Sequence, residues 1–358
     1  MLHWKSKVHM RLERDVKLTF DDVLIRPKRS TLISRSDVNL EREFGFRHSE
    51  QKWKGVPIVA ANMDTTGLFS IAKILQNYKM ITCMQKFYST KDFERSWNDT
   101  DPNFTVVTCG TTEDSFDLLE RKMATNEDIK MICIDVANGY REVFLDYVKR
   151  VRANFPDKIL IAGNVATREM TEALILAGAD IVKVGIGPGS VCTTRKVAGV
   201  GYPQLSAIAE CADGAHGLNG HVMSDGGCSS PGDVAKAFAA GADFVMLGGM
   251  FAGHDESGGE VVKGKDGKMY KSFYGMSSSK AMKTHYGEVA KHRAPEGKEV
   301  RVPYRGPLDE TVQSILGGVR SACSYVGARR IKDLPKCTTF IRVTRTTNEV
   351  YQKFNVEE

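Results

Sequence analysis

The sequence has no long apolar segment and no paired cysteine motif. No stretch approaches the ~20 apolar residues that a membrane-spanning helix requires, and the first ten residues lack the apolar core of a secretory signal. The eight cysteines are scattered and form no CxxC pair, which argues against a disulfide scaffold and against a zinc site. We therefore expect a cytosolic protein with free thiols and no membrane partner.

A large net charge is also absent. The formal charge is +6 and the isoelectric point is near 8.8. This excess is too small to predict nucleic-acid binding, although it favours anionic ligands such as phosphates. Apolar residues make up 42% of the 358 residues and charged residues 26%, which is ordinary for a globular protein with a full core. The length fits two average domains or one large α/β barrel.

Short β-type segments recur along the chain, with helical segments between them. Eight of them are found, at residues 57–62, 80–84, 104–110, 130–136, 158–164, 181–185, 221–227 and 244–249. Repeated βα units predict a parallel sheet, and eight strands can close a (β/α)8 barrel. The competing fold is a doubly wound sheet, but no GxGxxG motif opens a helix after the first strand. We predict a single α/β domain, a (β/α)8 TIM barrel spanning residues 1–358.

Three segments lie outside this repeat. Residues 1–50 precede the first strand and are expected to form an ordered arm, and residues 331–358 form a C-terminal tail. Residues 251–306 follow the eighth strand, on the face where barrel enzymes hold their active sites, so we expect a flap. The alternative is a tolerated surface loop. Within this insertion, residues 255–259 and 263–268 are predicted to form hairpin turns.

The segment Gly185–Arg195, with the sequence GIGPGSVCTTR, places one thiol directly after a glycine-rich turn. Three glycines and a proline indicate a backbone shaped for a purpose. Two hydroxyls and an arginine follow Cys192, so a nucleophile, proton carriers and a positive charge share one loop. This pattern predicts covalent chemistry on a polar or anionic substrate. The alternative is a buried structural cysteine.

Residues that follow the predicted strands should meet in one bowl at the mouth of the barrel. Asp225 and the glycine pairs Gly226–Gly227 and Gly248–Gly249 follow strands seven and eight, where barrels commonly bind phosphate. A carboxylate beside a phosphate site suits ribose hydroxyls, so we expect a nucleotide or a sugar phosphate. For each residue alone, ordinary turn formation is the alternative.

Two lysines raise a rival mechanism. Lys183 lies within the sixth strand and Lys86 follows the second, and a lysine inside a barrel can form a Schiff base with a carbonyl substrate. Lys183 could equally pair with a carboxylate inside the barrel. Glu296, in the expected flap, is either a catalytic carboxylate or a solvent-facing one.

The chain resembles the IMP dehydrogenase/GMP reductase family from about Leu18 to Arg345. The cysteine loop is highly specific for this family, and four other motifs accompany it. The motifs are Gly185–Arg195, Gly199–Gln204, Ser224–Cys228, Gly248–Met250 and Tyr274–Ser278.

Two absences favour the reductases of this family over the dehydrogenases. There is no room between the second and third strands for the paired regulatory (CBS-type) module that typical dehydrogenases carry. The flap also lacks the Arg-Tyr pair with which family dehydrogenases activate water, and His285–Tyr286 is its nearest counterpart. An IMP dehydrogenase without its regulatory module is the alternative, and a catalytically silent nucleotide-binding regulator is a further one.

The resemblance implies an oxidoreductase of purine nucleotide salvage. It would catalyse the irreversible, NADPH-dependent reductive deamination of GMP to IMP and ammonia through a thioimidate on Cys192. Thr194 and Glu296 would supply the proton that the departing amine needs. The remaining implied substrate contacts are Asp225, Gly226, Gly227, Gly248, Gly249, Gly275, Met276, Ser277, Arg293 and Gly297, together with Glu296.

The resemblance also implies a cofactor site, a potassium ion and a homotetramer. The implied NADPH contacts are Ser34, Arg35, Lys86, Asp135, Val136, Ala137, Ile186, Gly187, Met276, His292, Arg293, Ser321, Ala322, Cys323 and Ser324. Ser34 and Arg35 would come from a neighbouring subunit and contact the 2′-phosphate. Family members often have Tyr where His292 stands. The implied potassium ligands are Gly187, Gly189, Cys192 and Arg195.

Overall fold

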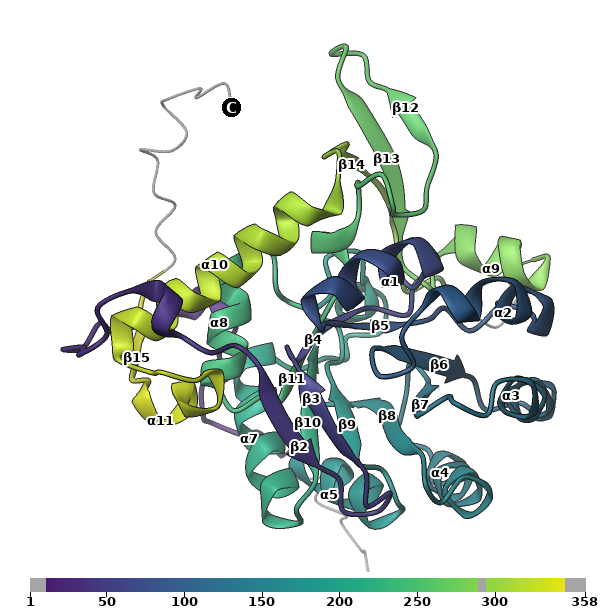
Figure 1. The fold of residues 1–358 in the computed structure, drawn as a ribbon, viewed down its shortest axis with the longest axis horizontal. Coiled ribbons are helices and arrows are strands. Elements are labelled where there is room, and N and C mark those ends of the chain that lie inside the picture. Colours follow the sequence, from purple (N-terminus) through teal and green to yellow (C-terminus); the bar gives the residue numbers. More distant parts are fainter. Residues whose placement is uncertain (1–10, 289–293, 345–358) are drawn as a thin grey trace, which may run out of the picture.

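Eight parallel strands close into a barrel in the computed structural model, which describes residues 11–288 and 294–344 (Figure 1). The strands are β4 (Ile58–Ala60), β5 (Ile81–Cys83), β6 (Thr105–Cys109), β7 (Met131–Asp135), β8 (Ile159–Val165), β9 (Ile181–Val184), β10 (His221–Asp225) and β11 (Phe244–Leu247). Their order around the barrel follows the chain, and β11 pairs with β4. Each predicted segment contains one strand, so the (β/α)8 barrel is confirmed.

The outer layer consists of helices that follow the strands in turn. They are α1 (Phe69–Leu75), α2 (Thr90–Ser96), α3 (Glu113–Thr125), α4 (Glu142–Asn154), α5 (Arg168–Leu176), α7 (Gln204–Gly217), α8 (Pro231–Ala239) and α10 (Leu308–Val326). Shorter 3-10 turns are η1 (Phe20–Asp22), η2 (Arg35–Asp37), η3 (Gln76–Tyr78), η4 (Trp97–Asp99), η5 (Gly249–Phe251) and η6 (Ile331–Asp333). Within residues 11–288 and 294–344, no helix combines the length and apolarity needed to cross a membrane.

The start of α8 is fixed by its own sequence, directly after the glycines that follow β10. Ser230 Oγ accepts a hydrogen bond from the Asp233 backbone N–H, and the Asp233 carboxylate accepts one from the Ser230 N–H. Pro231 occupies the first turn, where its missing N–H costs nothing. This capping box sets where the loop after β10 ends.

The end of the predicted N-terminal arm, together with the residues just after it, closes the bottom of the barrel. Strands β2 (Arg42–Gly45) and β3 (Lys52–Gly55) form an antiparallel hairpin. Phe44 stacks on Phe244 with ring centroids 4.5 Å apart, and Trp53 packs on the same ring at 5.5 Å. Both aromatic side chains are buried with the apolar interior of the barrel. The amino-terminal end of the barrel is therefore filled by the arm.

The arm also pairs with the predicted C-terminal tail. Strand β1 (Val23–Ile25) runs antiparallel to β15 (Phe340–Arg342), and Leu24 lies opposite Ile341. The short helix α11 (Leu334–Cys337) precedes β15. The described part of residues 331–358 is thus folded against the arm.

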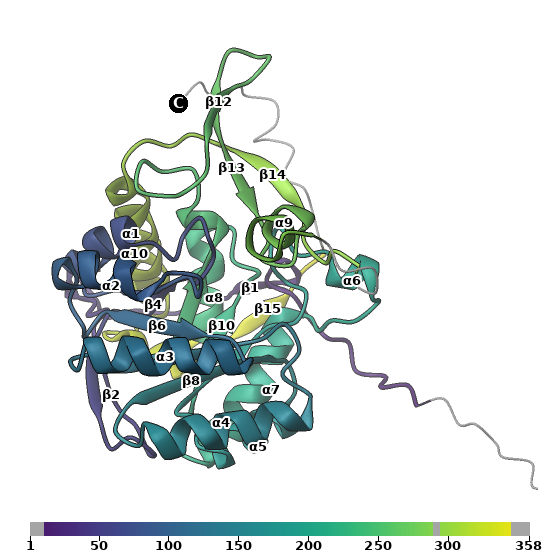
Figure 2. The same ribbon diagram turned by 90° about the vertical axis from the view of Figure 1, so that its right-hand side faces the viewer.

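The predicted flap forms a separate small sheet above the barrel mouth (Figure 2). It contains β12 (Val261–Lys263), β13 (Met269–Tyr274), α9 (Ser279–Tyr286) and β14 (Glu299–Pro303). The turn predicted within 263–268 joins β12 to β13 and is confirmed. The prediction of a hairpin turn at residues 255–259 is wrong. Its loop precedes β12 and is held by the Lys271 ammonium, which donates to the carbonyls of His254 and Ser257 at 2.7 Å each.

A buried carboxylate organises a charged cluster near the bottom of the barrel. Asp243 accepts hydrogen bonds from Arg42 Nη2 and His216 Nε2, each at 2.7 Å, and from the Val222 N–H at 3.0 Å. Burial opposes its charge, but the hydrogen bond from His216 and the His221 ring, whose Nδ1 lies 3.5 Å away, hold the pKa of Asp243 below its ordinary value. In return, the hydrogen bond to Asp243 raises the pKa of His216.

This cluster gives the fold a pH dependence. A histidine whose pKa is raised by folding adds stability below about pH 6.5, its unfolded value, and loses that stability as pH rises through its folded pKa. We expect the melting temperature to fall more steeply between pH 6 and pH 9 in the unaltered protein than in His216→Gln. The stability that the contact between His216 and Asp243 contributes should stay below about 1 kcal/mol, because the His216 side chain is 46% exposed. Equal slopes in thermal melts would contradict this assignment.

Candidate active site

The cysteine loop leaves β9 and ends in the short helix α6 (Thr194–Val197). A side chain at Gly185 would overlap the carbonyl oxygen of Asp225, so only glycine allows this close approach of the two strand ends. The Cys192 N–H donates to the Gly189 carbonyl at 3.0 Å, which folds the loop back on itself. The loop is therefore shaped around the thiol.

Cys192, Thr194 and Glu296 form a continuous hydrogen-bonded chain. The Cys192 thiol donates to Thr194 Oγ1 at 3.3 Å, and that hydroxyl donates to Glu296 Oε2 at 2.7 Å. All three side chains are half-buried, so a ligand can reach them. The thiol thus has a direct route for its proton through a hydroxyl to a carboxylate. Such a chain suits activation of a nucleophile and proton delivery to a leaving group.

The flap backbone fixes Glu296 in this position. The Thr193 N–H donates to the Glu296 carbonyl at 2.8 Å, and the Glu296 N–H donates to the Ser277 carbonyl at 3.0 Å. The Lys298 N–H donates to the Val191 carbonyl at 2.9 Å. The segment around Glu296 therefore lies between the cysteine loop and the carboxyl-terminal end of β13.

The predicted phosphate glycines pack directly on the cysteine loop. Gly226 has a φ of +87°, and a Cβ there would lie 3.1 Å from the backbone nitrogen of Gly189. A Cβ on Gly249 would lie 3.0 Å from Ser190 Oγ. Gly227 and Gly248 complete the two turns. The two glycine turns thus pack against the cysteine loop, where the rule that strand ends meet predicts them.

Lys183 lies inside the barrel between two carboxylates. Its Nζ is 2.6 Å from Asp135 Oδ1 and 3.2 Å from Asp225 Oδ2. Burial lowers the pKa of an amine, but the charges of Asp135 and Asp225 outweigh it and hold the pKa of Lys183 well above its ordinary value. A Schiff base needs a neutral amine. The alternative that Lys183 pairs with a carboxylate inside the barrel is therefore confirmed, and this pairing disfavours a Schiff base.

The residues predicted to hold the base lie where the flap meets the barrel. Gly275 and Gly297 approach closely, since a Cβ on Gly275 would lie 3.3 Å from the Gly297 Cα. The sulfur of Met276 accepts a hydrogen bond from the Asp64 N–H at 3.3 Å. Asp64 Oδ2 in turn accepts hydrogen bonds from Tyr274 at 2.9 Å and His285 at 2.7 Å. Ser277 joins this group through the bond to Glu296 given above.

The predicted cofactor residues other than Met276 fall into two groups that different elements carry. The first group lines the barrel mouth and contains Lys86, Asp135, Val136, Ala137, Ile186 and Gly187. In the second group, Ser34 caps η2, Arg35 begins it, and η2 packs against α10, whose carboxyl-terminal half carries Ser321, Ala322, Cys323 and Ser324. The Cys323 side chain is fully buried and not available to a ligand. His292 and Arg293 lie outside the described residues.

The carbonyl groups of the cysteine loop fit a potassium ion. No described residue donates a hydrogen bond to the carbonyls of Gly187 or Cys192, while the Gly189 carbonyl accepts one from Cys192. Carbonyl oxygens are suitable ligands for this ion. The Arg195 side chain is itself a cation and donates to the Tyr202 carbonyl at 2.6 Å, so only its backbone could be a ligand.

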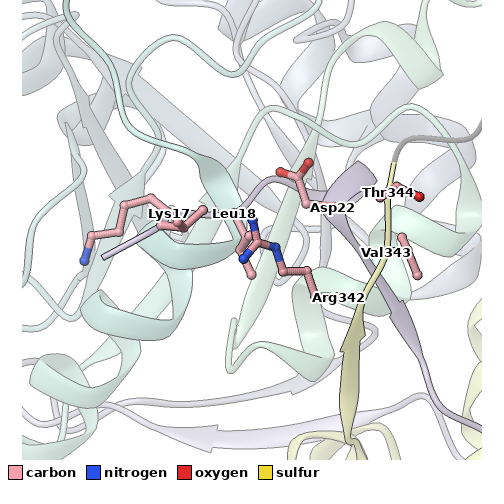
Figure 3. Close-up of a pocket in the computed structure, with 7 residues that line it drawn as sticks. Lys17, Leu18, Asp22, Arg342, Val343 and Thr344 are labelled. Carbon is pink, nitrogen blue, oxygen red and sulfur yellow. The ribbon is translucent and has the colours of Figure 1, made fainter. Parts of the chain in front are cut away.

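A cavity of about 600 Å³ lies elsewhere, between the arm and the end of β15 (Figure 3). It is lined by Val16, Lys17, Leu18, Asp22, Arg342, Val343 and Thr344. Lys17 pairs with Glu210 at 2.8 Å, and the Leu18 N–H donates to Ser206 Oγ at 2.8 Å. These contacts anchor the arm to α7, and no predicted site residue lines the cavity.

Two further residues organise the site although no role for them follows from the motifs. Asn164 Nδ2 donates to Asp225 Oδ2 at 2.9 Å and to the Gly185 carbonyl at 3.0 Å. The buried Gln204 donates to the Val184 carbonyl at 2.8 Å and to Ser224 Oγ at 3.3 Å. Both link the ends of neighbouring strands. Their only sequence signals are a strand end for Asn164 and the Gly-Tyr-Pro-Gln motif for Gln204.

Comparison with known proteins identifies the family of this chain. A sequence model of the IMP dehydrogenase / GMP reductase domain matches residues 17–350. A Caenorhabditis elegans protein named GMP reductase is 58% identical over 349 residues, which cover 97% of each chain. Proteins of the same name from Vibrio cholerae serotype O1 and Phytophthora infestans are each 59% identical. The first covers 96% of this chain and 99% of its own, and the second 95% and 94%. This chain therefore belongs to the IMP dehydrogenase/GMP reductase family.

Proposed function

We propose that this chain acts as a GMP reductase, which converts GMP to IMP and ammonia with NADPH in purine nucleotide salvage. The observation that carries the proposal is the hydrogen-bonded chain from Cys192 through Thr194 to Glu296. Relatives named GMP reductase, 58–59% identical over nearly the whole chain, favour this function over that of a dehydrogenase without its regulatory module.

The first half of the reaction needs only residues of this chain and the nucleotide. The Cys192 thiol passes its proton through Thr194 to Glu296, and the sulfur adds to C2 of the guanine ring. An amine leaves badly unless it is protonated, so the proton returns from Glu296 through Thr194 to the exocyclic nitrogen. The carbon–nitrogen bond then breaks, ammonia departs and C2 stays bonded to the sulfur.

The second half needs the nicotinamide cofactor. NADPH, when bound, would supply a hydride to C2. Cys192 would then take back the electron pair of the carbon–sulfur bond as that bond breaks, and IMP would be released. The half-buried residues of the barrel mouth suit a polar cofactor, because Asp135 there carries a charge that Lys183 and Lys86 stabilise against burial. A potassium ion on the loop carbonyls would stiffen the cysteine loop.

The nucleotide is oriented by its ribose and phosphate. Asp225 would accept from the ribose hydroxyls, and the turns Gly226–Gly227 and Gly248–Gly249 would present backbone N–H groups to the phosphate. The two glycine turns pack on the cysteine loop, which supports this arrangement. A phosphate bound to these turns would place its nucleotide next to the cysteine loop. Gly275, Met276, Ser277 and Gly297 would contact the base.

We further propose that the enzyme is a cytosolic homotetramer. One group of predicted cofactor residues follows the barrel strands and the other lies on η2 and α10, so we expect a second copy to bring Ser34 and Arg35 to the barrel mouth. Ile33 beside them is 99% exposed, and Leu24 and Ile341 are also exposed, as expected of an apolar contact surface. All eight cysteines are free, which suits a reducing compartment.

A direct assay tests the proposed function. Purified protein mixed with GMP and NADPH should consume the nicotinamide absorbance and release ammonia and IMP in equal amounts. Turnover with IMP and NAD but none with GMP and NADPH would overturn the proposal. Binding of GMP without any turnover would instead indicate a nucleotide-binding regulator.

A further inference from the structure

One buried cation is shared between two parts of the site that are expected to hold different ligands. Lys183 Nζ contacts Asp135 at 2.6 Å and Asp225 at 3.2 Å. Asp135 belongs to the predicted cofactor residues and Asp225 to the predicted substrate residues. The Lys183 side chain is only 2% exposed, so it acts on ligands through these carboxylates rather than by touching solvent.

The surroundings of Lys183 add little other charge. Asn62 Oδ1 lies 3.5 Å from its Nζ, and the thiols of Cys83 and Cys133 face it from β5 and β7. Lys86 acts on Asp135 from the mouth. The two carboxylates therefore depend on Lys183 as their common buried counter-ion, with Lys86 as a second cation for Asp135.

The hydrogen bonds around Asp225 leave one of its oxygens for a ligand. Lys183 and Asn164 both donate to Oδ2, and no described residue donates to Oδ1. Oδ1 is then the oxygen on which a ribose hydroxyl can be bound. The orientation of this oxygen is set by the two donors on Oδ2.

Building on the proposed function, we propose that Lys183 is a positioning residue that couples the nucleotide site to the cofactor site. Its ammonium holds both carboxylates in place, Asp225 toward the nucleotide and Asp135 toward the cofactor. A change at one carboxylate therefore alters the contact of the ammonium with the other carboxylate.

Removal of the ammonium should change the protonation of the pair. Without the ammonium the two carboxylates repel each other, and Asp135, whose pKa Lys183 lowers, takes up a proton more readily. In Lys183→Met one proton can replace the lost charge at acidic pH, whereas at alkaline pH both carboxylates remain uncompensated. Ligand affinity in this variant should therefore fall as pH rises, which a merely structural role does not predict.

The test is binding of GMP and of NADPH, each alone, to Cys192→Ala protein between pH 5.5 and pH 8.5, with and without Lys183→Met. We expect both affinities to fall at least ten-fold at pH 8.5 and to recover toward pH 5.5. Lys183→Arg should stay within about three-fold of the parent at every pH, since it keeps the charge. Lys122→Met, at a buried lysine of α3 that packs on Phe93, is the matched control and should match the parent.

The outcomes separate this proposal from the proposed function. Parent protein that binds neither GMP nor NADPH would refute the function itself. Parent protein that binds both, with Lys183→Met either unchanged or weakened for one ligand only, would overturn the coupling. If Lys183→Met does not fold, Asp135→Asn replaces it. In Asp135→Asn, the GMP affinity measured without cofactor should change at least three-fold. The control is Asp128→Asn, at a carboxylate that contacts Trp97, and it should leave this affinity unchanged. No change in Asp135→Asn would overturn the coupling.

Discussion

Cys192→Ala should abolish conversion of GMP to IMP, with kcat reduced by roughly 10⁴-fold or more, as expected when a covalent nucleophile is removed. The alanine cannot bond to C2, and neither Thr194 nor Glu296 supplies another nucleophile in that place. GMP binding should persist, because Asp225 and the glycine turns do not depend on the sulfur. Steady-state kinetics and equilibrium binding measure the two effects separately.

The matched control for this variant is Cys337→Ala. Cys337 is a half-buried thiol of α11, a helix that packs on α8 and α10, and its loss should leave kcat unchanged. Mass spectrometry of the unaltered enzyme, quenched during turnover, should find a purine adduct on the peptide that contains Cys192. An undiminished rate in Cys192→Ala would refute the covalent mechanism.

Glu296→Gln should lower kcat by roughly 10²–10⁴-fold, the usual contribution of a general acid or base. Glutamine keeps the size of the side chain and leaves the backbone bonds to Thr193 and Ser277 in place, so the flap should stay docked. It cannot take the proton that Thr194 passes on. KM for GMP should change little, and the quenched enzyme should hold less adduct.

Glu299→Gln provides the comparison within the same flap. Glu299 begins β14 and accepts hydrogen bonds from Lys280 at 2.6 Å and Ser272 at 2.7 Å, without a contact to the thiol chain. Its substitution should leave kcat unchanged. If both glutamate variants lost activity equally, the effect would come from the flap sheet and not from a proton path.

The barrel could be predicted because each of its strands has a local signal. Segments such as 130–136 and 158–164 are apolar and β-branched, which is how a strand buried on both faces appears in sequence. The pairing of Val23–Ile25 with Phe340–Arg342 has no such signal, because it joins segments more than three hundred residues apart. The hairpin that fills the barrel bottom depends on contacts between residues two hundred positions apart, such as Phe44 with Phe244.

The candidate site was predictable to the extent that strand ends meet in a barrel. That rule alone placed Asp225, the glycine turns and the cysteine loop together, and the structure brings them into contact. Glu296 came from family resemblance, since a flap carries no periodicity that aims a side chain. The sharing of Lys183 between Asp135 and Asp225 depends on side-chain reach across the barrel, which the sequence pattern leaves open.

The sulfur belongs to the barrel, and the carboxylate paired with it belongs to the flap, 102 residues beyond Thr194. Backbone hydrogen bonds of Thr193 and Lys298 hold the flap segment against the cysteine loop. A substitution that loosened this docking would separate the proton acceptor from the nucleophile without altering either side chain.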